Sequence, residues 1–167
     1  LPDVNYVCGE KSNDSFEEHF RFVLPGYNVR PLELQGAIGI EQLKKLPNFI
    51  IDRRKNGILF QNKMDTHPDL MIQEEIGNSS WFGFSLIIKP ESKINRRILI
   101  KELTRLGFET RPIVTGNFSK SDVMKFLDYE IPFKLQNAEY IDNNGLFIGN
   151  QHFLINEAIE KIANLKI

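Results

Sequence analysis

Residues that could bind an anion first appear in a polar loop at 25–31, which carries the amide of Asn28 and the guanidinium of Arg30. A helix is predicted to follow directly, and it contains Gly36 and Gly39. Each glycine costs a helix about 1 kcal/mol relative to alanine, so close packing against another helix or subunit would have to offset that cost. A polar loop fixed at the start of a packed helix suits an anionic ligand, and a purely structural turn is the alternative.

A carboxylate and a second guanidinium stand two residues apart at Glu109 and Arg111. On a strand this spacing places both side chains on one face. Arginine is well shaped for phosphate, and a glutamate can accept hydrogen bonds from the donor edge of a purine, but a surface ion pair fits equally well. The turns at 116–118 and 149–152 carry Asn117, Phe118 and His152; they could line a sugar site or be turn chemistry alone.

The residue types and their spacing do not indicate several common kinds of functional site. His19, His67 and His152 are far apart in the chain, and Cys8 has no nearby histidine. Neither a metal site nor a cysteine nucleophile is therefore expected. No phosphate-binding P-loop or dinucleotide fingerprint is present. The formal net charge of −1 gives no basic excess for binding nucleic acid or an anionic membrane.

Composition is that of an ordinary globular domain, with 41% hydrophobic and 26% charged residues. A single cysteine excludes an internal disulfide and favours a reducing compartment. The apolar runs are too short to span a bilayer, and the first residues do not resemble a signal peptide. A cytoplasmic location is therefore expected. The chain begins Leu-Pro-Asp rather than with Met, which reads as mid-chain sequence.

Hydrophobic periodicity predicts an α/β (α+β) fold with a long helix that Pro47 either kinks or breaks, in which case Asn48 caps the second segment. Residues 52–55 are expected to form a solvated face of that helix. In the strand at 81–89, Phe82, Phe84, Leu86 and Ile88 are predicted to share one face. A strand–helix–strand unit is expected over 81–113. The predicted helices are 31–64, 95–106 (beginning at Ser92 or Asn95 and ending before Gly107), 120–128, 137–143 and 155–165, and the predicted strands are 70–72, 81–89, 108–113 and 145–150.

Several strings resemble a known family. Residues 26–33 and 36–46 are similar to the second half of the DegT/DnrJ/EryC1/StrS family, whose members are pyridoxal-phosphate-dependent sugar aminotransferases and dehydratases. Residues 80–84, 111–118 and 144–150 resemble the dehydratase branch. The resemblance implies the C-terminal small domain of a type I, aspartate aminotransferase-like enzyme, with a long kinked helix and a small, mostly antiparallel sheet on which helices pack. It also implies an interface segment at 1–66 and a small domain at 67–167.

The chemistry implied by the resemblance is removal of the 3-hydroxyl group from GDP-4-keto-6-deoxymannose, towards colitose in O-antigen lipopolysaccharide. Pyridoxal or pyridoxamine phosphate would be the cofactor, glutamate the amino donor and a homodimer the assembly. The family's catalytic histidine and ring-binding aspartate belong upstream, so no catalytic residue is expected in this chain, which alone should be inactive. Two alternatives remain open, namely a perosamine-type nucleotide-sugar 4-aminotransferase and a non-catalytic α+β binding or dimerisation module.

Binding roles also follow from the resemblance. Asn28 matches the asparagine that reaches across the dimer to the cofactor phosphate, and Arg30 lies in the same loop. Glu109 and Arg111 match positions near the nucleotide and its phosphates. The implied contacts on the sugar side are Asn117, Phe118 and His152.

Overall fold

The computed structural model describes residue 16 and residues 32–166. The loop that carries Asn28 and Arg30 lies outside the described residues, so the structure does not address the two predicted cofactor contacts. The elements, in chain order, are α2 (Glu33–Met64), β1 (Leu70–Ile72), β2 (Gly83–Ile88), α3 (Arg96–Arg105), β3 (Thr110–Arg111), the 3-10 helices η2 (Phe118–Lys120) and η3 (Asp122–Phe126), α4 (Gln136–Asn144), β4 (Gly145–Gly149) and α5 (Asn156–Ala163).

The strands form one antiparallel sheet in the order β1-β2-β4-β3. Phe84 of β2 and Thr110 of β3 both pair with Ile148 of β4, from opposite sides. The prediction of a small antiparallel sheet is confirmed. The predicted strand–helix–strand unit is present in sequence, but its two strands do not pair, because β4 arrives later in the chain and inserts between them. The strand predicted at 108–113 is shorter than expected, with ladder pairing only at 110–111.

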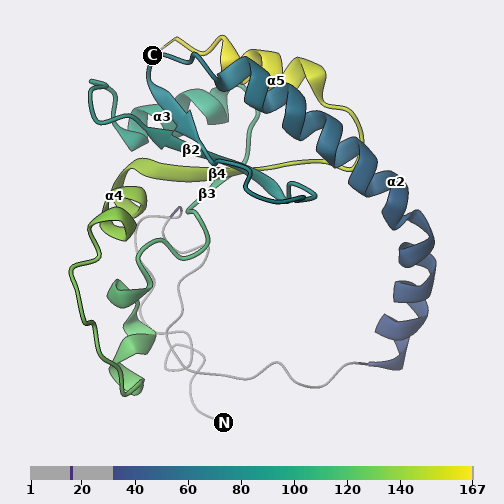
Figure 1. The fold of residues 1–167 in the computed structure, drawn as a ribbon, viewed down its shortest axis with the longest axis horizontal. Coiled ribbons are helices and arrows are strands. Elements are labelled where there is room, and N and C mark those ends of the chain that lie inside the picture. The colour runs from purple at the N-terminus through teal and green to yellow at the C-terminus, as the bar shows by residue number, and fades with distance from the viewer. Residues whose placement is uncertain (1–15, 17–31, 167) are drawn as a thin grey trace.

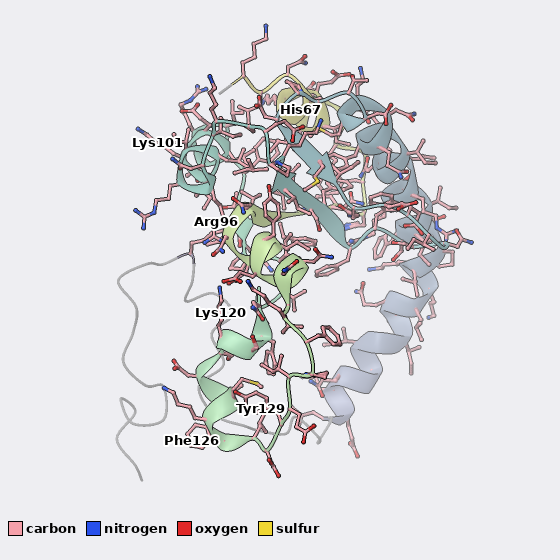
Figure 2. The ribbon with its side chains drawn as sticks, turned by 60° about the vertical axis from the view of Figure 1, so that its left-hand side comes forward. His67, Arg96, Lys101, Lys120, Phe126 and Tyr129 are labelled. Carbon is pink, nitrogen blue, oxygen red and sulfur yellow. The ribbon has the colours of Figure 1, made fainter. Side chains whose placement is uncertain are left out.

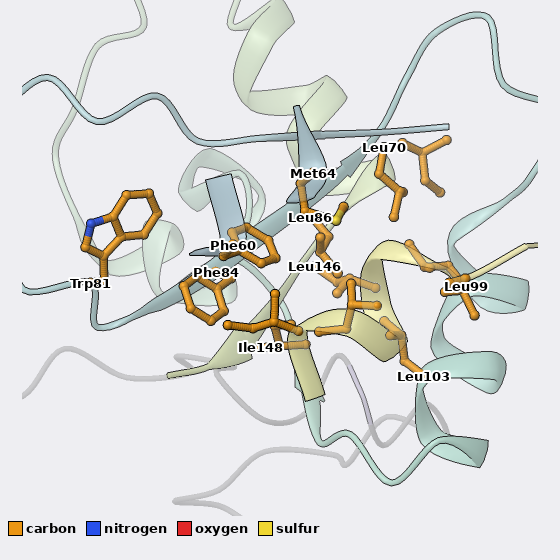
Figure 3. Packing of buried hydrophobic residues seen from close by; sticks show 14 residues of the cluster. Phe60, Met64, Leu70, Trp81, Phe84, Leu86, Leu99, Leu103, Leu146 and Ile148 are labelled. Atoms are coloured by element: carbon orange, nitrogen blue, oxygen red, sulfur yellow. The ribbon is translucent and has the colours of Figure 1, made fainter. Parts of the chain in front are cut away.

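One face of the sheet carries the hydrophobic core, and helices α2, α3 and α5 cover it (Figure 1). Phe60 of α2 stacks on Phe84 of β2 with ring centroids 4.1 Å apart, which joins the long helix to the sheet. Figure 3 shows these rings beside Leu146 and Ile148 of β4, with Leu99 and Leu103 of α3 close by. Burial of these apolar side chains is the main force that holds the helices against the sheet.

Helix α2 is a single helix with Pro47 inside it, so the prediction of a kink rather than a break is the correct alternative. Figure 1 shows α2 curving away from the sheet toward its N-terminal end. Its first half is largely exposed, whereas its last turns contribute Phe60 and Met64 to the core. A proline inside a helix removes one intrahelical hydrogen bond and clashes with the preceding turn, so Pro47 favours a bend in α2 without ending the helix.

The predicted solvated face at residues 52–55 is partly wrong. Arg53 Nη1 donates to the carbonyls of Trp81 and Phe82, at 3.3 and 3.2 Å. Arg54 donates to the carbonyls of Ser79 and Asn78 at 3.1 and 2.8 Å. The carbonyl groups of the loop at 78–82 need hydrogen-bond donors, and the two arginines supply them. The sequence alone does not show that this loop lies against the helix.

The ends of α3 follow the sequence prediction. Of the two candidate starts, Asn95 caps the helix, and its side chain accepts a hydrogen bond from Ile98 N at 3.0 Å. Gly107 has φ +88° and ends it. Gly107 N donates to Thr104 O and Phe108 N donates to Leu103 O, both at 2.9 Å, which is the Schellman pattern.

His67 is buried between the end of α2 and β1, and its Nδ1 accepts hydrogen bonds from the backbone N–H groups of Asp69 and Leu70, both at 3.2 Å. Desolvation lowers the pKa of His67 below its ordinary value of 6.5, against the opposing influence of Asp69 and of the Leu165 carbonyl. His67 Nε2 nevertheless makes no hydrogen bond of acceptable geometry to any residue that the structure describes. The folded protein therefore favours the neutral ring.

Acidification is accordingly expected to destabilise the fold. Because the folded-state pKa lies below the unfolded value, the stability contributed by neutral His67 is complete above pH 6.5 and is lost as the pH falls from 6.5 toward the lowered value. His67→Asn keeps an acceptor near Nδ1 and should flatten this part of the curve of unfolding free energy against pH. Urea unfolding at a series of pH values measures it. An unchanged slope in His67→Asn would contradict the assignment.

Candidate functional site

The face of the sheet opposite the core carries small residues at its centre. Alternation along the strands places Gly83 and Ser85 of β2, Phe147 of β4 and Arg111 of β3 on this face. A Cβ on Gly83 would lie 2.2 Å from Phe147 Cζ, so glycine is what allows the phenylalanine ring to lie across the neighbouring strand. Helix α4 adjoins one end of this face, where Tyr140 donates a hydrogen bond to the carbonyl of Ile88 at 2.7 Å.

A cavity of about 290 Å³ opens on this face. Its walls are mostly apolar, and Arg111 is the charged member of the residues that line it. Those residues are Phe82, Ser85, Arg111, Pro112, Ile113, Val114 and Phe147. A cavity of this kind, with aromatic walls and a guanidinium at its edge, suits a planar ring that carries an attached anion.

Two phenylalanines form the aromatic wall. The rings of Phe82 and Phe147 lie 5.8 Å apart between centroids with an interplanar angle of 24°, and Phe82 is 74% exposed. The prediction that Phe82 shares a face with Phe84 is therefore wrong. Trp81 has φ +52°, and the strand begins only at Gly83, so the chain turns before regular alternation starts. The exposed ring is available to a ligand, which the alternating pattern did not indicate.

Arg111 is held by the predicted partner. Its Nε and Nη2 both donate to Glu109 Oε1, at 3.2 and 3.1 Å. The two side chains remain 41% and 69% exposed, so the pair contributes at most about 1 kcal/mol to stability. The pair with Glu109 is therefore a weak, solvent-exposed one. Both predicted alternatives, the surface ion pair and the phosphate site, remain compatible with this geometry.

Asn117 and Phe118 lie beyond the end of β3, next to α4. Asn117 is buried, and its Oδ1 accepts hydrogen bonds from the N–H and hydroxyl of Ser119, at 3.2 and 2.7 Å, while Phe118 is exposed. Two short 3-10 helices stand here in place of the helix predicted at 120–128.

The 3-10 segment is joined to α4 by Lys120, whose Nζ lies 3.3 Å from Asp142 Oδ2 and 3.5 Å from Glu139 Oε1. Desolvation is the largest single influence and opposes the charge of Lys120, but the carboxylates of Asp142 and Glu139 together outweigh it and raise the pKa of Lys120. Figure 2 shows Lys120 near α4, with Phe126 and Tyr129 at the far end of the segment.

His152 lies in the loop that follows β4. Its ring centroid is 4.4 Å from that of Phe49 on α2 and 5.4 Å from that of Phe153. Since β3 and β4 are antiparallel, the residues that follow β3 and those that follow β4 leave opposite ends of the sheet. The structure therefore pairs Glu109 with Arg111 but does not gather the five predicted substrate residues into one cluster.

The loop at residues 149–152 is bonded to α2 and to the segment that precedes β2. Asn150 Nδ2 donates to the carbonyls of Arg53 and Trp81, at 3.0 and 2.9 Å, and its backbone N–H donates to Phe82 O at 3.3 Å. The loop of His152 is thereby tied to the residue that walls the cavity. No sequence signal pointed to this role, because an asparagine after glycine is equally typical of a turn.

Few polar side chains are buried among the described residues. The buried polar side chains are amides, a threonine and a histidine, and neither a carboxylate nor a lysine is buried within residues 32–166. That part of the chain also contains no group of three or more metal-ligating side chains. Its helices include none with both the length and the hydrophobicity required to cross a bilayer.

The fold is that of the small domain of pyridoxal-phosphate-dependent aminotransferase-type enzymes, as comparison with solved structures shows. A crystal structure of GDP-4-keto-6-deoxymannose-3-dehydratase with bound GDP-perosamine, in a mutant form, superposes with a TM-score of 0.78 at 56% identity over 98% of this chain and 42% of that one. The same values hold for a structure of that enzyme with a trapped PLP-glutamate geminal diamine.

The chain belongs to the DegT/DnrJ/EryC1/StrS aminotransferase family, whose sequence profile matches residues 5–165. Among curated relatives, the GDP-4-keto-6-deoxy-D-mannose 3-dehydratase of Yersinia pseudotuberculosis is 56% identical over 166 residues, which are 99% of this chain and 42% of the relative. The chain thus spans less than half the length of the relatives it matches. The predicted family and fold are confirmed.

Proposed function

We propose that this chain is the C-terminal part of a pyridoxal-phosphate-dependent nucleotide-sugar 3-dehydratase that acts on GDP-4-keto-6-deoxymannose. The observation that carries the proposal is the 56% identity to an enzyme of that name along 99% of the chain. When bound, the cofactor in its pyridoxamine form supplies the amine that condenses with the 4-keto group. The catalytic histidine and the cofactor's ring partner are proposed to lie outside this chain, which alone would be inactive.

Within this proposal, the cavity beside Arg111 receives the nucleotide. The base lies against Phe82 and Phe147, the guanidinium of Arg111 meets phosphate oxygens, and Glu109 accepts hydrogen bonds from the donor edge of the base. The mostly apolar cavity walls exclude water from the base, and the exposed guanidinium stays accessible to the charged diphosphate.

The sugar-side contacts proposed for Asn117, Phe118 and His152 have unequal support. Asn117 Oδ1 already accepts two hydrogen bonds, so a sugar contact would use Nδ2. Phe118 and His152 are exposed. Asn28 and Arg30 are retained as proposed contacts to the cofactor phosphate.

A cytoplasmic homodimer completes the proposal. The first half of α2 exposes Leu34, Ile38 and Leu43, and a Cβ on Gly36 or Gly39 would have no neighbour within 4 Å among the described residues. Apolar side chains exposed along one helix are typical of a surface that another chain or domain covers. The interface segment at 1–66 and the small domain at 67–167 are kept as the proposed division, although α2 residues beyond position 56 pack into the core of the small domain.

The experiment supplies the full-length protein with pyridoxal phosphate, glutamate and GDP-4-keto-6-deoxymannose. A 3-dehydratase releases a 3-deoxy-4-keto sugar and ammonia, whereas the alternative 4-aminotransferase gives an aminated sugar, and a non-catalytic module gives neither. Arg111→Ala should raise KM for the nucleotide sugar about 10- to 100-fold, since a hydrogen bond to a charged group contributes about 1.5–3 kcal/mol. The rate of the glutamate half-reaction should not change.

Arg111→Lys retains the charge without the bidentate geometry and should fall between wild type and Arg111→Ala. The matched control is Arg97→Ala on the exposed side of α3, which removes a surface arginine from another part of the domain. An unchanged KM in Arg111→Ala would reject the assignment of Arg111 to the nucleotide.

A further inference from the structure

One face of α2 carries a buried polar network that reaches two loops of the sheet. Phe49, Arg53, Asn56 and Phe60 follow each other at helical spacing, so their side chains project from the same side of the helix. The side chain of Phe60 lies in the hydrophobic core. The side chains of Phe49, Arg53 and Asn56 instead contact loops. Those loops precede β2 and follow β4, and because the two strands are antiparallel neighbours, they lie at the same end of the sheet.

Asn56 is the centre of the network and is completely buried. Its Nδ2 lies within hydrogen-bond distance of Asn150 Oδ1, Gln151 O and Phe153 O, at 3.0, 3.3 and 2.8 Å. Its Oδ1 accepts from Ile155 N at 3.2 Å. The two backbone carbonyls that flank His152 are therefore both held by one side chain.

The same helix face fixes the other loop. Asn150 Nδ2 and Arg53 Nη1 both donate to Trp81 O, and Arg53 also donates to Phe82 O. Leaving a buried polar group without its partner costs about 1–3 kcal/mol. Neither loop can therefore shift relative to α2 without losing several hydrogen bonds, and the exposed side chains of Phe82 and His152 are presented from a rigid base.

We infer that Asn56 and Asn150 are positioning residues, which set the places of Phe82 and His152 for binding of the nucleotide sugar. This inference rests on the proposed function. Neither asparagine is exposed enough to serve as a contact to the substrate, since Asn56 is 0% and Asn150 is 4% exposed. Both act through the residues that they hold. The ring contact between Phe49 and His152 also joins α2 to the loop that follows β4.

The test uses the full-length protein and the variants Asn56→Ser and Asn150→Ser. Two measurements are made at a temperature at which each variant remains folded. The first is the NMR resonance of the His152 ring, which depends on the aromatic rings of Phe49 and Phe153 beside it. The second is the steady-state rate with the nucleotide sugar. We expect the His152 resonance to move, KM to rise about 3- to 10-fold, and the rate of the glutamate half-reaction to stay within about twofold of wild type.

A structural role alone would produce a different result. Leu103→Ala, in the core beside α3, is the control that loses stability without touching either loop, and it should leave KM and the His152 resonance unchanged. A double-mutant cycle supplies the second control, because Asn150→Ser and Phe82→Ala should be non-additive in KM if Asn150 acts through Phe82. Additive effects would overturn that part of the inference.

The outcomes are separable. An unmoved His152 resonance in Asn56→Ser overturns the positioning role, whatever the enzyme does. A moved resonance with an unchanged KM overturns the functional part of the inference and leaves Asn56 as a structural residue. Absence of turnover in the wild-type protein rejects the proposed function, and the inference about substrate binding fails with it, while the resonance still reports whether the network fixes the loop.

Discussion

Replacing Phe84 with alanine is expected to lower the free energy of unfolding by about 3–5 kcal/mol, the usual cost of removing a buried phenylalanine. The Phe84 ring is 1% exposed and stacks on Phe60, so its loss leaves a cavity between α2 and the sheet. Denaturant unfolding measures the change. Phe82→Ala is the matched control, two residues away in the same segment, and should cost less than about 1 kcal/mol because its ring is mostly exposed.

Comparing Phe82→Ala with Phe84→Ala distinguishes a Phe82 ring in the core, as the alternating pattern predicts, from the exposed ring of the structure. If the alternating pattern of the sequence applied from residue 82 onward, both substitutions would cost a similar amount. A large loss of stability in Phe82→Ala would show that its ring is buried in the folded protein, and it would remove the aromatic wall from the proposed nucleotide cavity. The expected phenotype of Phe82→Ala is instead weaker binding of the nucleotide sugar with a nearly normal unfolding transition.

Gly57→Ala is expected to destabilise the protein by about 1–3 kcal/mol, the range found for overpacked cores. A Cβ on Gly57 would lie 2.6 Å from ring atoms of Trp81. That ring cannot easily move away, because Trp81 is buried with its ring beside that of Phe84, and its backbone is held by hydrogen bonds from Arg53 and Asn150 to its carbonyl. Thermal and denaturant unfolding of the full-length protein measure the effect. A wild-type transition in Gly57→Ala would contradict the close packing of α2 on Trp81.

Two other glycines of the same helix are the controls. Gly36 and Gly39 have space for a Cβ among the described residues, so Gly36→Ala and Gly39→Ala should each stabilise an uncovered helix by about 0.5–1 kcal/mol. A loss of stability, together with a shift from dimer to monomer in sedimentation, would support the proposed contact between subunits through this face. The sign of the change in the free energy of unfolding therefore shows whether another chain covers this part of α2.

Local sequence was sufficient for much of the fold. Asn95 and Gly107 mark the ends of α3, because a cap side chain and a left-handed residue are satisfied by atoms within a few positions. The long helix and the closing helix also follow from periodicity, since burial of one face requires the same spacing wherever the partner lies. The strand predicted at 145–150 follows from a short apolar run between two turns, and β4 ends one residue earlier. Pro47 predicts a perturbation of the helix, but a kink and a break are locally equivalent, and only the packing of the later turns favours the continuous helix.

For the candidate site, the sequence by itself determined that Glu109 and Arg111 lie close enough to pair, since only one residue separates them, although Glu109 itself precedes β3. Only the tertiary structure decided the rest. It inserted β4 between β2 and β3, turned the chain at Trp81 so that Phe82 left the core, and buried Asn56 against the loop after β4, about 95 residues away. These features depend on contacts between distant segments, whose free energies no local pattern of residue types encodes.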